Sequence, residues 1–157
     1  MRYAAFIIST CIALAGVALA AEKQVVLKVS GLIEGAPVHF TMADLRAMPT
    51  TTLETSTVVT DGVHSFTGVL LRDLLAQLGA TGDVITATAL NDYVVDIPRA
   101  DVEQYDVIVG YSMNGAELDR ADKGPLWIVY PRDGHEALQD IRYDYRWVWQ
   151  LSELEIR

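Results

Sequence analysis

The sequence predicts an α+β fold: a single β-rich domain with mixed or antiparallel strand pairing and only modest helices. Short β-branched and apolar runs recur from Val25 to the C-terminus, and turn residues rather than long helical segments separate them. No Gly-rich dinucleotide-binding or phosphate-binding pattern follows any of these runs, which argues against a doubly wound nucleotide-binding fold.

The strands are expected where β-branched runs end at turn residues. Asp61-Gly62 and Asn114-Gly115 are hairpin signals, and Gly124-Pro125 precedes an apolar run typical of a buried strand. The expected strands are residues 25–29, 38–40, 50–60, 63–66, 84–90, 93–97, 107–113, 126–130 and 147–156.

Helices are expected between some of these strands. Thr41 with Asp44 resembles a capping box that opens the first helix. Leucines at helical spacing predict the second helix, and Gly79 ends it. The expected helices are residues 42–48, 70–78 and a small one near 100–105, whereas residues 132–146 are polar and irregular.

The first twenty residues predict an export signal. Arg2 precedes an apolar run that ends in the cleavage pattern Ala18-Leu19-Ala20. The run is short for a membrane span, which needs about 20 apolar residues. We expect a cleaved signal peptide over residues 1–20 and a periplasmic domain over residues 21–157 that does not span the membrane. An uncleaved anchor and a lipoprotein acylated at Cys11 are the alternatives.

Charge and cysteine content exclude several classes of function. The chain has 12 Lys and Arg against 21 Asp and Glu, a formal net charge of −9. An acidic chain repels phosphates, so no nucleic-acid partner is expected. Cys11 is the only cysteine and leaves with the signal peptide. The mature chain then has no disulfide, no thiolate metal ligand and no cysteine nucleophile.

The sequence indicates neither a metal site nor a catalytic centre. His39, His64 and His135 are far apart and show no metal-binding spacing, and the carboxylates show no calcium-loop pattern. No G-x-S-x-G elbow surrounds a serine. We therefore assign no metal ligand and no catalytic residue.

Aromatic and polar residues are dense near the C-terminus, over residues 123–133 and 142–149. Such rings and cations suit a flat heteroaromatic ligand, and Asn91-Asp92-Tyr93 adds hydrogen-bonding groups in a predicted turn. Core positions for Trp127 and Trp149, and a simple turn at Asn91-Asp92, are the structural alternatives.

A series of short blocks covers most of residues 25–157. The blocks are Thr52-Leu53-Glu54-Thr55, Phe66–Leu75, Ala89–Tyr93, Ile97-Pro98, Asn114–Leu118, Gly124–Pro131 and Arg146-Trp147-Val148. In this order and spacing they resemble the oxidoreductase molybdopterin-binding domain of the sulfite oxidase superfamily. The resemblance implies a cysteine whose thiolate binds molybdenum after the first block, but this sequence has Thr55 there.

A threonine hydroxyl is a poor substitute for a thiolate on molybdenum. The sequence is also much shorter than those of the catalytic enzymes, whose dimerisation domain it lacks. It is most similar to small, exported, cysteine-free members of the superfamily. That resemblance implies a pterin ligand without a metal, and a role as periplasmic sensor for membrane proteins that make or degrade cyclic di-GMP.

We therefore expect a non-catalytic periplasmic pterin-binding protein, with no molybdenum cofactor, that signals to the extracytoplasmic domain of a membrane partner. Trp127 or Tyr130 would stack on the ring, but strand alternation keeps both from lining one pocket. Asn91 or Asp92 would bind the pyrimidine edge, and the arginines would meet polar substituents. The candidate ligand-binding residues are Asn91, Asp92, Tyr93, Lys123, Trp127, Tyr130, Arg132, Arg146 and Trp147. A molybdenum-dependent oxidoreductase and a ligand-free interaction module are the alternatives.

Overall fold

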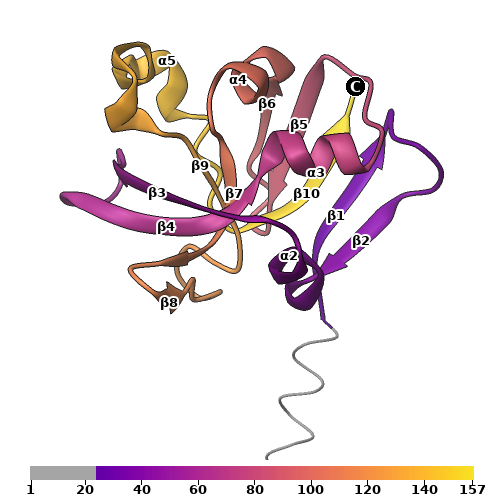
Figure 1. The fold of residues 1–157 in the computed structure, drawn as a ribbon, viewed down its shortest axis with the longest axis horizontal. Coiled ribbons are helices and arrows are strands. Elements are labelled where there is room, and N and C mark those ends of the chain that lie inside the picture. Colours follow the sequence, from indigo (N-terminus) through magenta and orange to yellow (C-terminus); the bar gives the residue numbers. More distant parts are fainter. Residues whose placement is uncertain (1–23) are drawn as a thin grey trace, which may run out of the picture.

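Strands dominate the computed structural model, which describes residues 24–157 (Figure 1). The predicted signal peptide lies outside the described residues. The strands are β1 (Val25–Gly31), β2 (Val38–Thr41), β3 (Thr50–Ser56), β4 (Val63–Leu70), β5 (Val84–Ala89), β6 (Val94–Pro98), β7 (Ile108–Met113), β8 (Ala116–Glu117), β9 (Trp127–Val129) and β10 (Leu151–Ile156). The helices are α2 (Met42–Ala47), α3 (Leu71–Gln77), α4 (Arg99–Gln104), α5 (Ile141–Asp144) and the 3-10 turns η1 (Arg132–Gly134) and η2 (Glu136–Gln139).

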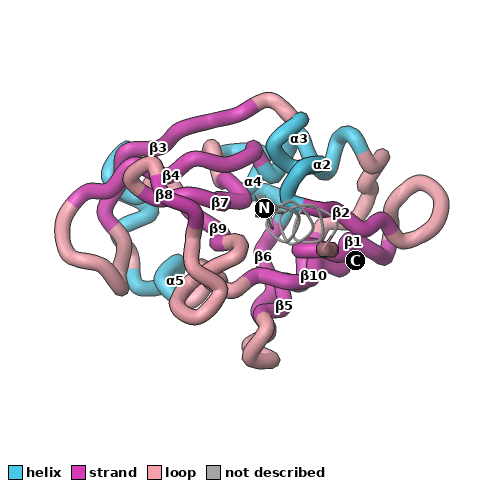
Figure 2. The backbone as a smooth tube through the Cα atoms, turned by 90° about the horizontal axis from the view of Figure 1, so that it is seen from below, coloured by secondary structure: helices cyan, strands magenta, loops and turns pink. Residues whose placement is uncertain are grey.

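The strands form two five-stranded sheets. The first has the order β2-β1-β10-β5-β6; the second has the order β3-β4-β7-β8, with β9 also paired to β7. β10 is parallel to β1 and antiparallel to β5, whereas the pairs of the second sheet are antiparallel. The predicted α+β class with mixed and antiparallel pairing is confirmed. In both views the two sheets lie on opposite sides of the molecule (Figures 1 and 2).

Local sequence signals explain several element boundaries. The predicted capping box is present: the Asp44 amide donates to Thr41 Oγ1 over 3.2 Å, and the Thr41 amide donates to Asp44 Oδ2 over 2.7 Å. Asn114 and Gly115 both adopt positive φ, 52° and 80°, as a type I′ hairpin requires. Gly68 lies at an irregularity between β4 and β7, where a Cβ would come within 2.2 Å of the Val109 carbonyl oxygen.

Two predicted strands are shorter than expected. β3 ends at Ser56 because the Thr57 hydroxyl accepts the amides of Val59, at 3.1 Å, and Thr60, at 3.0 Å, which turns the chain. Residues 147–150 precede β10 as an irregular crossing segment: the Ile128 amide donates to the Val148 carbonyl, and Trp149 forms an isolated bridge with Trp127. Both departures bring loops to the same side of the fold.

A hydrophobic core joins the two sheets. It includes side chains from the centre of each sheet, such as Leu154 of β10 and Val109 of β7, both fully buried. Within residues 24–157, no helix combines the length and apolar character needed to cross a membrane.

Candidate ligand-binding site

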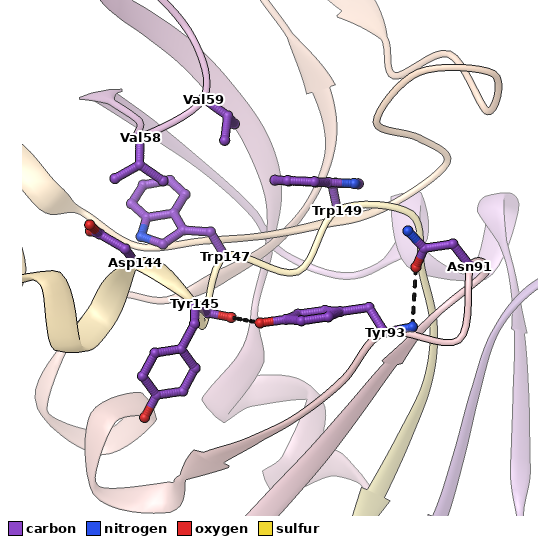
Figure 3. Close-up of a pocket in the computed structure, with 8 residues that line it drawn as sticks. All are labelled: Val58, Val59, Asn91, Tyr93, Asp144, Tyr145, Trp147 and Trp149. Atoms are coloured by element: carbon purple, nitrogen blue, oxygen red, sulfur yellow. Dashed lines mark hydrogen bonds between the residues drawn. The ribbon is translucent and has the colours of Figure 1, made fainter.

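A cavity of about 270 Å³ lies where the turn after β3, the turn between β5 and β6, and the segment from α5 to β10 meet (Figure 3). Its lining residues are Val58, Val59, Asn91, Tyr93, Asp144, Tyr145, Trp147 and Trp149. The volume is near the lower end of the range for small-molecule sites, about 300 to 1,000 Å³. The cavity therefore suits a small ligand.

Tyr93 and Trp149 present flat ring faces in this cavity. Both rings are seen edge-on in Figure 3, one above the other and nearly parallel. Tyr93 is 43% exposed, while Trp149 is partly buried. Since both residues line the same cavity, their parallel faces offer a slot for a planar ring.

Hydrogen bonds hold the Tyr93 ring in place. Asp92 adopts a positive φ of 64° in the turn between β5 and β6, and Asn91 Oδ1 accepts the Tyr93 amide over 3.2 Å. The Tyr93 hydroxyl donates to the Tyr145 carbonyl over 2.7 Å, which ties the turn to the segment after α5 (Figure 3). Burial, and then the neighbouring Tyr145, raise the pKa of the Tyr93 hydroxyl, so it remains a donor at neutral pH.

Two of the lining residues each carry a buried polar atom without a hydrogen-bond partner among the described residues. The two atoms are Asp144 Oδ1, an acceptor, and Trp147 Nε1, a donor. Trp147 is only 2% exposed and packs its ring against Trp127 and Tyr130, with centroid distances of 6.4 and 6.1 Å. The two atoms are buried behind the cavity surface, so the accessible wall is mainly apolar and aromatic.

The structure brings three of the nine predicted residues, Asn91, Tyr93 and Trp147, to this cavity. It corrects the stacking role given to Trp127 and Tyr130, because both are fully buried and have no free ring face. The rings of Trp127 and Phe66 pack edge to face at a centroid distance of 5.3 Å. The structural alternative for Trp127, a core position, is the one that the fold shows.

Tyr130 and Arg146 belong to a buried polar cluster. The Tyr130 hydroxyl donates to Asp101 Oδ2 over 3.0 Å, and Arg146 Nη1 forms an ion pair with the same oxygen. Arg146 also lies 4.8 Å from the centroid of the Tyr143 ring. Burial, and then the Asp101 carboxylate, raise the pKa of Tyr130 above its ordinary value. These partners give both residues a structural role outside the cavity.

The remaining three predicted residues also lie away from the cavity lining. Asp92 is an exposed turn residue, and Lys123 Nζ pairs with Asp122 over 2.8 Å. Arg132 belongs to η1. Five lining residues have no predicted ligand role: Val58, Val59, Asp144, Tyr145 and Trp149. Trp149 and Asp144 belong to the aromatic and polar stretch 142–149 noted in the sequence, whereas the two valines lie in a turn that the sequence predicted as part of a strand.

The family of this chain follows from its similarity to known proteins. A family model described as "Oxidoreductase molybdopterin binding domain" matches residues 15–135, well over half of the chain. The chain belongs to this family. It is thus a domain of the molybdopterin-binding oxidoreductase type, and the predicted membership of the sulfite oxidase superfamily is confirmed.

A solved structure supports the fold of this family member. The sulfane dehydrogenase SoxCD from Paracoccus pantotrophus matches with a TM-score of 0.64 and 24% identity over 83% of this chain. The chain spans 37% of the length of that SoxCD chain, and a likeness at this identity shows the fold alone. No curated protein matches the chain significantly.

The family implies a molybdenum cofactor, and Thr55 tests whether this chain fits one. Thr55, at the position that the resemblance gives to the metal-binding cysteine, is fully buried. Its hydroxyl accepts the Asp133 amide over 3.2 Å and donates to the Ser56 carbonyl over 3.2 Å. Residues 24–157 contain no cysteine, and no group of three or more His, Asp or Glu among them is placed to hold a metal ion. The residues at this position do not fit a thiolate-anchored metal.

Further hydrogen bonds close the chain around Thr55. The Ser56 amide and hydroxyl each donate to the Asp133 carboxylate over 2.6 Å. The Ser56 hydroxyl, ahead of its amide and Arg132, lowers the pKa of Asp133. The end of β3 is therefore bound to η1 by a carboxylate that stays ionised at neutral pH.

Proposed function

We propose that this chain is a periplasmic, non-catalytic pterin-binding protein that senses its ligand for a membrane protein of cyclic di-GMP signalling. The observation that supports the ligand is the pair of parallel rings, Tyr93 and Trp149, in one small cavity. Stacking of a heteroaromatic base on an aromatic side chain contributes about 1–3 kcal/mol. A pterin is a flat bicycle with a polar edge and fits such a slot.

The surroundings of Thr55 support a binding role without catalysis. Its hydroxyl is buried and already hydrogen-bonded within the protein, where the enzymes of the superfamily use a thiolate. The cavity, in contrast, retains the ring faces of Tyr93 and Trp149. The chain thus keeps the features needed to hold a pterin ring and lacks the expected metal anchor.

Calorimetric titration of the purified mature chain with pterin and with tetrahydrobiopterin tests the binding function. We expect saturable 1:1 binding at micromolar concentration. Trp149→Ala removes a stacking face and should weaken binding by about 5- to 150-fold, the equivalent of about 1–3 kcal/mol. Trp149→Phe is the matched control because it retains a flat ring, and it should bind within a few-fold of the wild type.

The absence of saturable binding of both compounds would contradict the pterin function. The chain would then be better explained as a ligand-free interaction module of this family.

The rim of the cavity supports a signalling partner. Val58, Val59, Tyr93 and Tyr145 line the cavity and are still 39–48% exposed. Exposed apolar groups gathered at one site mark interaction surfaces. A bound pterin would complete this surface, so a partner in contact with the rim would distinguish the bound from the free state.

The cellular concentration of cyclic di-GMP tests the signalling role. Deletion of the chain and chromosomal Trp149→Ala should shift the cyclic di-GMP level in the same direction, and Trp149→Phe should restore it. An unchanged level in the deletion strain would contradict the signalling role and leave the binding function standing. Mass spectrometry of the chain from a periplasmic fraction tests export, with Ala21 expected as the first residue.

A molybdenum-dependent oxidoreductase is the second candidate, because the chain belongs to a family described by that cofactor and activity. Metal analysis of protein purified from a molybdenum-replete periplasm separates the two candidates. Stoichiometric molybdenum would favour the oxidoreductase, whereas pterin without molybdenum would favour the sensor.

A further inference from the structure

Asn91 closes one end of the slot between the Tyr93 and Trp149 rings. Its Oδ1 accepts the Tyr93 amide over 3.2 Å, and the amide of the preceding residue, Leu90, donates to the Gln150 carbonyl over 2.8 Å. Because Gln150 directly follows Trp149, these two bonds hold Asn91 between the segments that carry the two rings. Figure 3 shows the Asn91 amide nitrogen just beyond the same ends of both rings, at a height between them.

The bond to Tyr93 determines which group of the Asn91 side chain remains for a ligand. A main-chain amide only donates, so the carbonyl oxygen of Asn91 faces it, and the side-chain NH2 group points elsewhere. Within residues 24–157 this NH2 group has no hydrogen-bond partner, and Asn91 is exposed and lines the cavity. The side chain therefore presents N–H donors to the edge of a ring in the slot.

The other polar side-chain groups of the lining do not face this slot. The Tyr93 hydroxyl donates to the Tyr145 carbonyl over 2.7 Å, and the Tyr145 hydroxyl points away from both rings in Figure 3. Asp144 lies beside the end of the Trp147 ring that is turned away from the slot, where Asp144 Oδ1 and Trp147 Nε1 are buried. The indole N–H of Trp149 lies in the plane of its own ring, so it does not point at a ring stacked on its face.

On the basis of the proposed pterin function, we propose that Asn91 is the specificity-determining residue for the 4-oxo group of the ligand. Its NH2 group donates to the 4-oxo oxygen of a pterin that lies between Tyr93 and Trp149. A carbonyl oxygen projects beyond the ring edge, whereas the ring nitrogens lie within it. The 4-oxo group is therefore the acceptor that reaches a side chain at the end of the slot. The cavity selects 4-oxopteridines over pteridines with a donor at this position.

Competition calorimetry of pterin against 2,4-diaminopteridine tests this assignment. The second compound has the same bicycle and the same 2-amino group, but an amino group replaces the 4-oxo group. It stacks alike and meets the NH2 group of Asn91 donor to donor. The gain or loss of one hydrogen bond between neutral groups should make the wild type prefer pterin by roughly 2- to 12-fold.

Asn91→Asp replaces the donor with an acceptor. One carboxylate oxygen can still accept the Tyr93 amide and keep the turn, while the other accepts the 4-amino group of 2,4-diaminopteridine. Hydrogen bonds to a charged group are stronger than those between neutral groups, so the preference should reverse by at least about the same factor. A purely structural role of Asn91 would instead weaken the binding of both compounds alike.

Asp92→Asn is the matched control. Asp92 is the next residue of the same turn, does not line the cavity and has a positive φ of 64°, which asparagine also adopts. This variant should keep the wild-type preference for pterin. Asn91→Asp/Asp92→Asn has the net charge of the wild type and should keep the reversed preference, which separates the hydrogen bond from a general effect of charge.

The outcomes separate this inference from the proposed function. Equal binding of both compounds by the wild type, or an unchanged preference for pterin in Asn91→Asp, would overturn the role of Asn91 and leave the pterin function intact. Failure of both compounds to bind the wild type would overturn the proposed function together with the role of Asn91. Circular dichroism of each variant verifies that it is folded.

Discussion

Thr55 occupies the position that the family resemblance gives to a metal-binding cysteine. The residue is fully buried, and its hydroxyl hydrogen-bonds both the main chain of β3 and the first turn of η1. A side chain in this environment is packed and satisfied by protein groups.

The Thr55→Cys variant tests whether the side chain at position 55 is closed to solvent. In a chain that begins at Ala21, the variant places a single thiol where the sequence otherwise contains none. Because Thr55 is fully buried, we expect the thiol to react with a maleimide or a disulfide reagent only after denaturation. The loss of the hydroxyl hydrogen bonds should lower the free energy of unfolding by about 1 kcal/mol.

Cysteine at the exposed position of Asp92 is the control, because it should react at the rate of a free thiol. Rapid labelling of native Thr55→Cys would contradict the buried environment of residue 55. It would instead support the use of this position to bind a metal.

The sequence predicted the positions of some candidate residues and not of others. Asn91 and Tyr93 were predicted from a turn, and the turn does bring them to the cavity. Trp127 and Tyr130 were predicted from aromatic density, but β9, which begins at Trp127 and ends just before Tyr130, is buried on both faces. In such a strand, alternation does not separate core side chains from pocket side chains. The Asp101 partner of Arg146 lies far away in sequence, so nothing local indicated it.

At the scale of elements, short turns rather than strands build the cavity. The turn after β3 supplies Val58 and Val59, and the Thr57 hydroxyl determines where that turn begins. The neighbouring Ser56–Asp133 bonds fasten the end of β3 to η1. Residues on such a fastened turn have a defined position without belonging to a regular element.

Ser56→Ala tests this fastening through the ionisation of Asp133. The Ser56 hydroxyl is the main cause of the lowered pKa of Asp133, so its removal should raise that pKa towards the ordinary value of about 3.9. Because the folded pKa is lowered, the bond stabilises the protein above pH about 3.9 and is lost as the pH falls through the folded pKa. Carboxyl-carbon NMR titration measures the shift directly.

Ser65→Ala on β4 is the control, because Ser65 makes no hydrogen bond to Asp133 among the described residues. It should leave the Asp133 titration unchanged. An unchanged pKa in Ser56→Ala would contradict the role of the hydroxyl and would leave only the amide bond to fasten η1.

Sequence signals predicted most regular elements and failed at the irregular ones. The capping box at Thr41 and the hairpin at Asn114-Gly115 depend on neighbouring residues, so they were visible in the sequence. The end of β3 depends on a side chain bonded to nearby amides, and the late start of β10 depends on main-chain bonds between residues 123–128 and 147–151. These main-chain bonds join parts of the chain that are distant in sequence, so the local spacing of apolar residues does not predict them.

At the scale of the whole molecule, one segment serves both the core and the cavity. Residues 147–149 supply two cavity tryptophans, and the chain then enters β10, the central strand of the first sheet. Trp149 also bridges to Trp127 of the second sheet. Because this segment supplies part of the cavity wall and continues into the central strand, we expect ligand binding to require the assembled fold and to add to global stability.

Leu154→Ala provides the test of this coupling. Leu154 is fully buried in β10, so the substitution should lower the free energy of unfolding by about 2–5 kcal/mol. A ligand that binds only the folded state, present at about 100 times its Kd, should restore about 2.7 kcal/mol. Urea denaturation with and without pterin measures both quantities. In Leu154→Ala/Trp149→Ala the same pterin concentration should restore much less, because the stacking face is gone. Equal restoration in the double variant would show that the pterin stabilises the fold from another site.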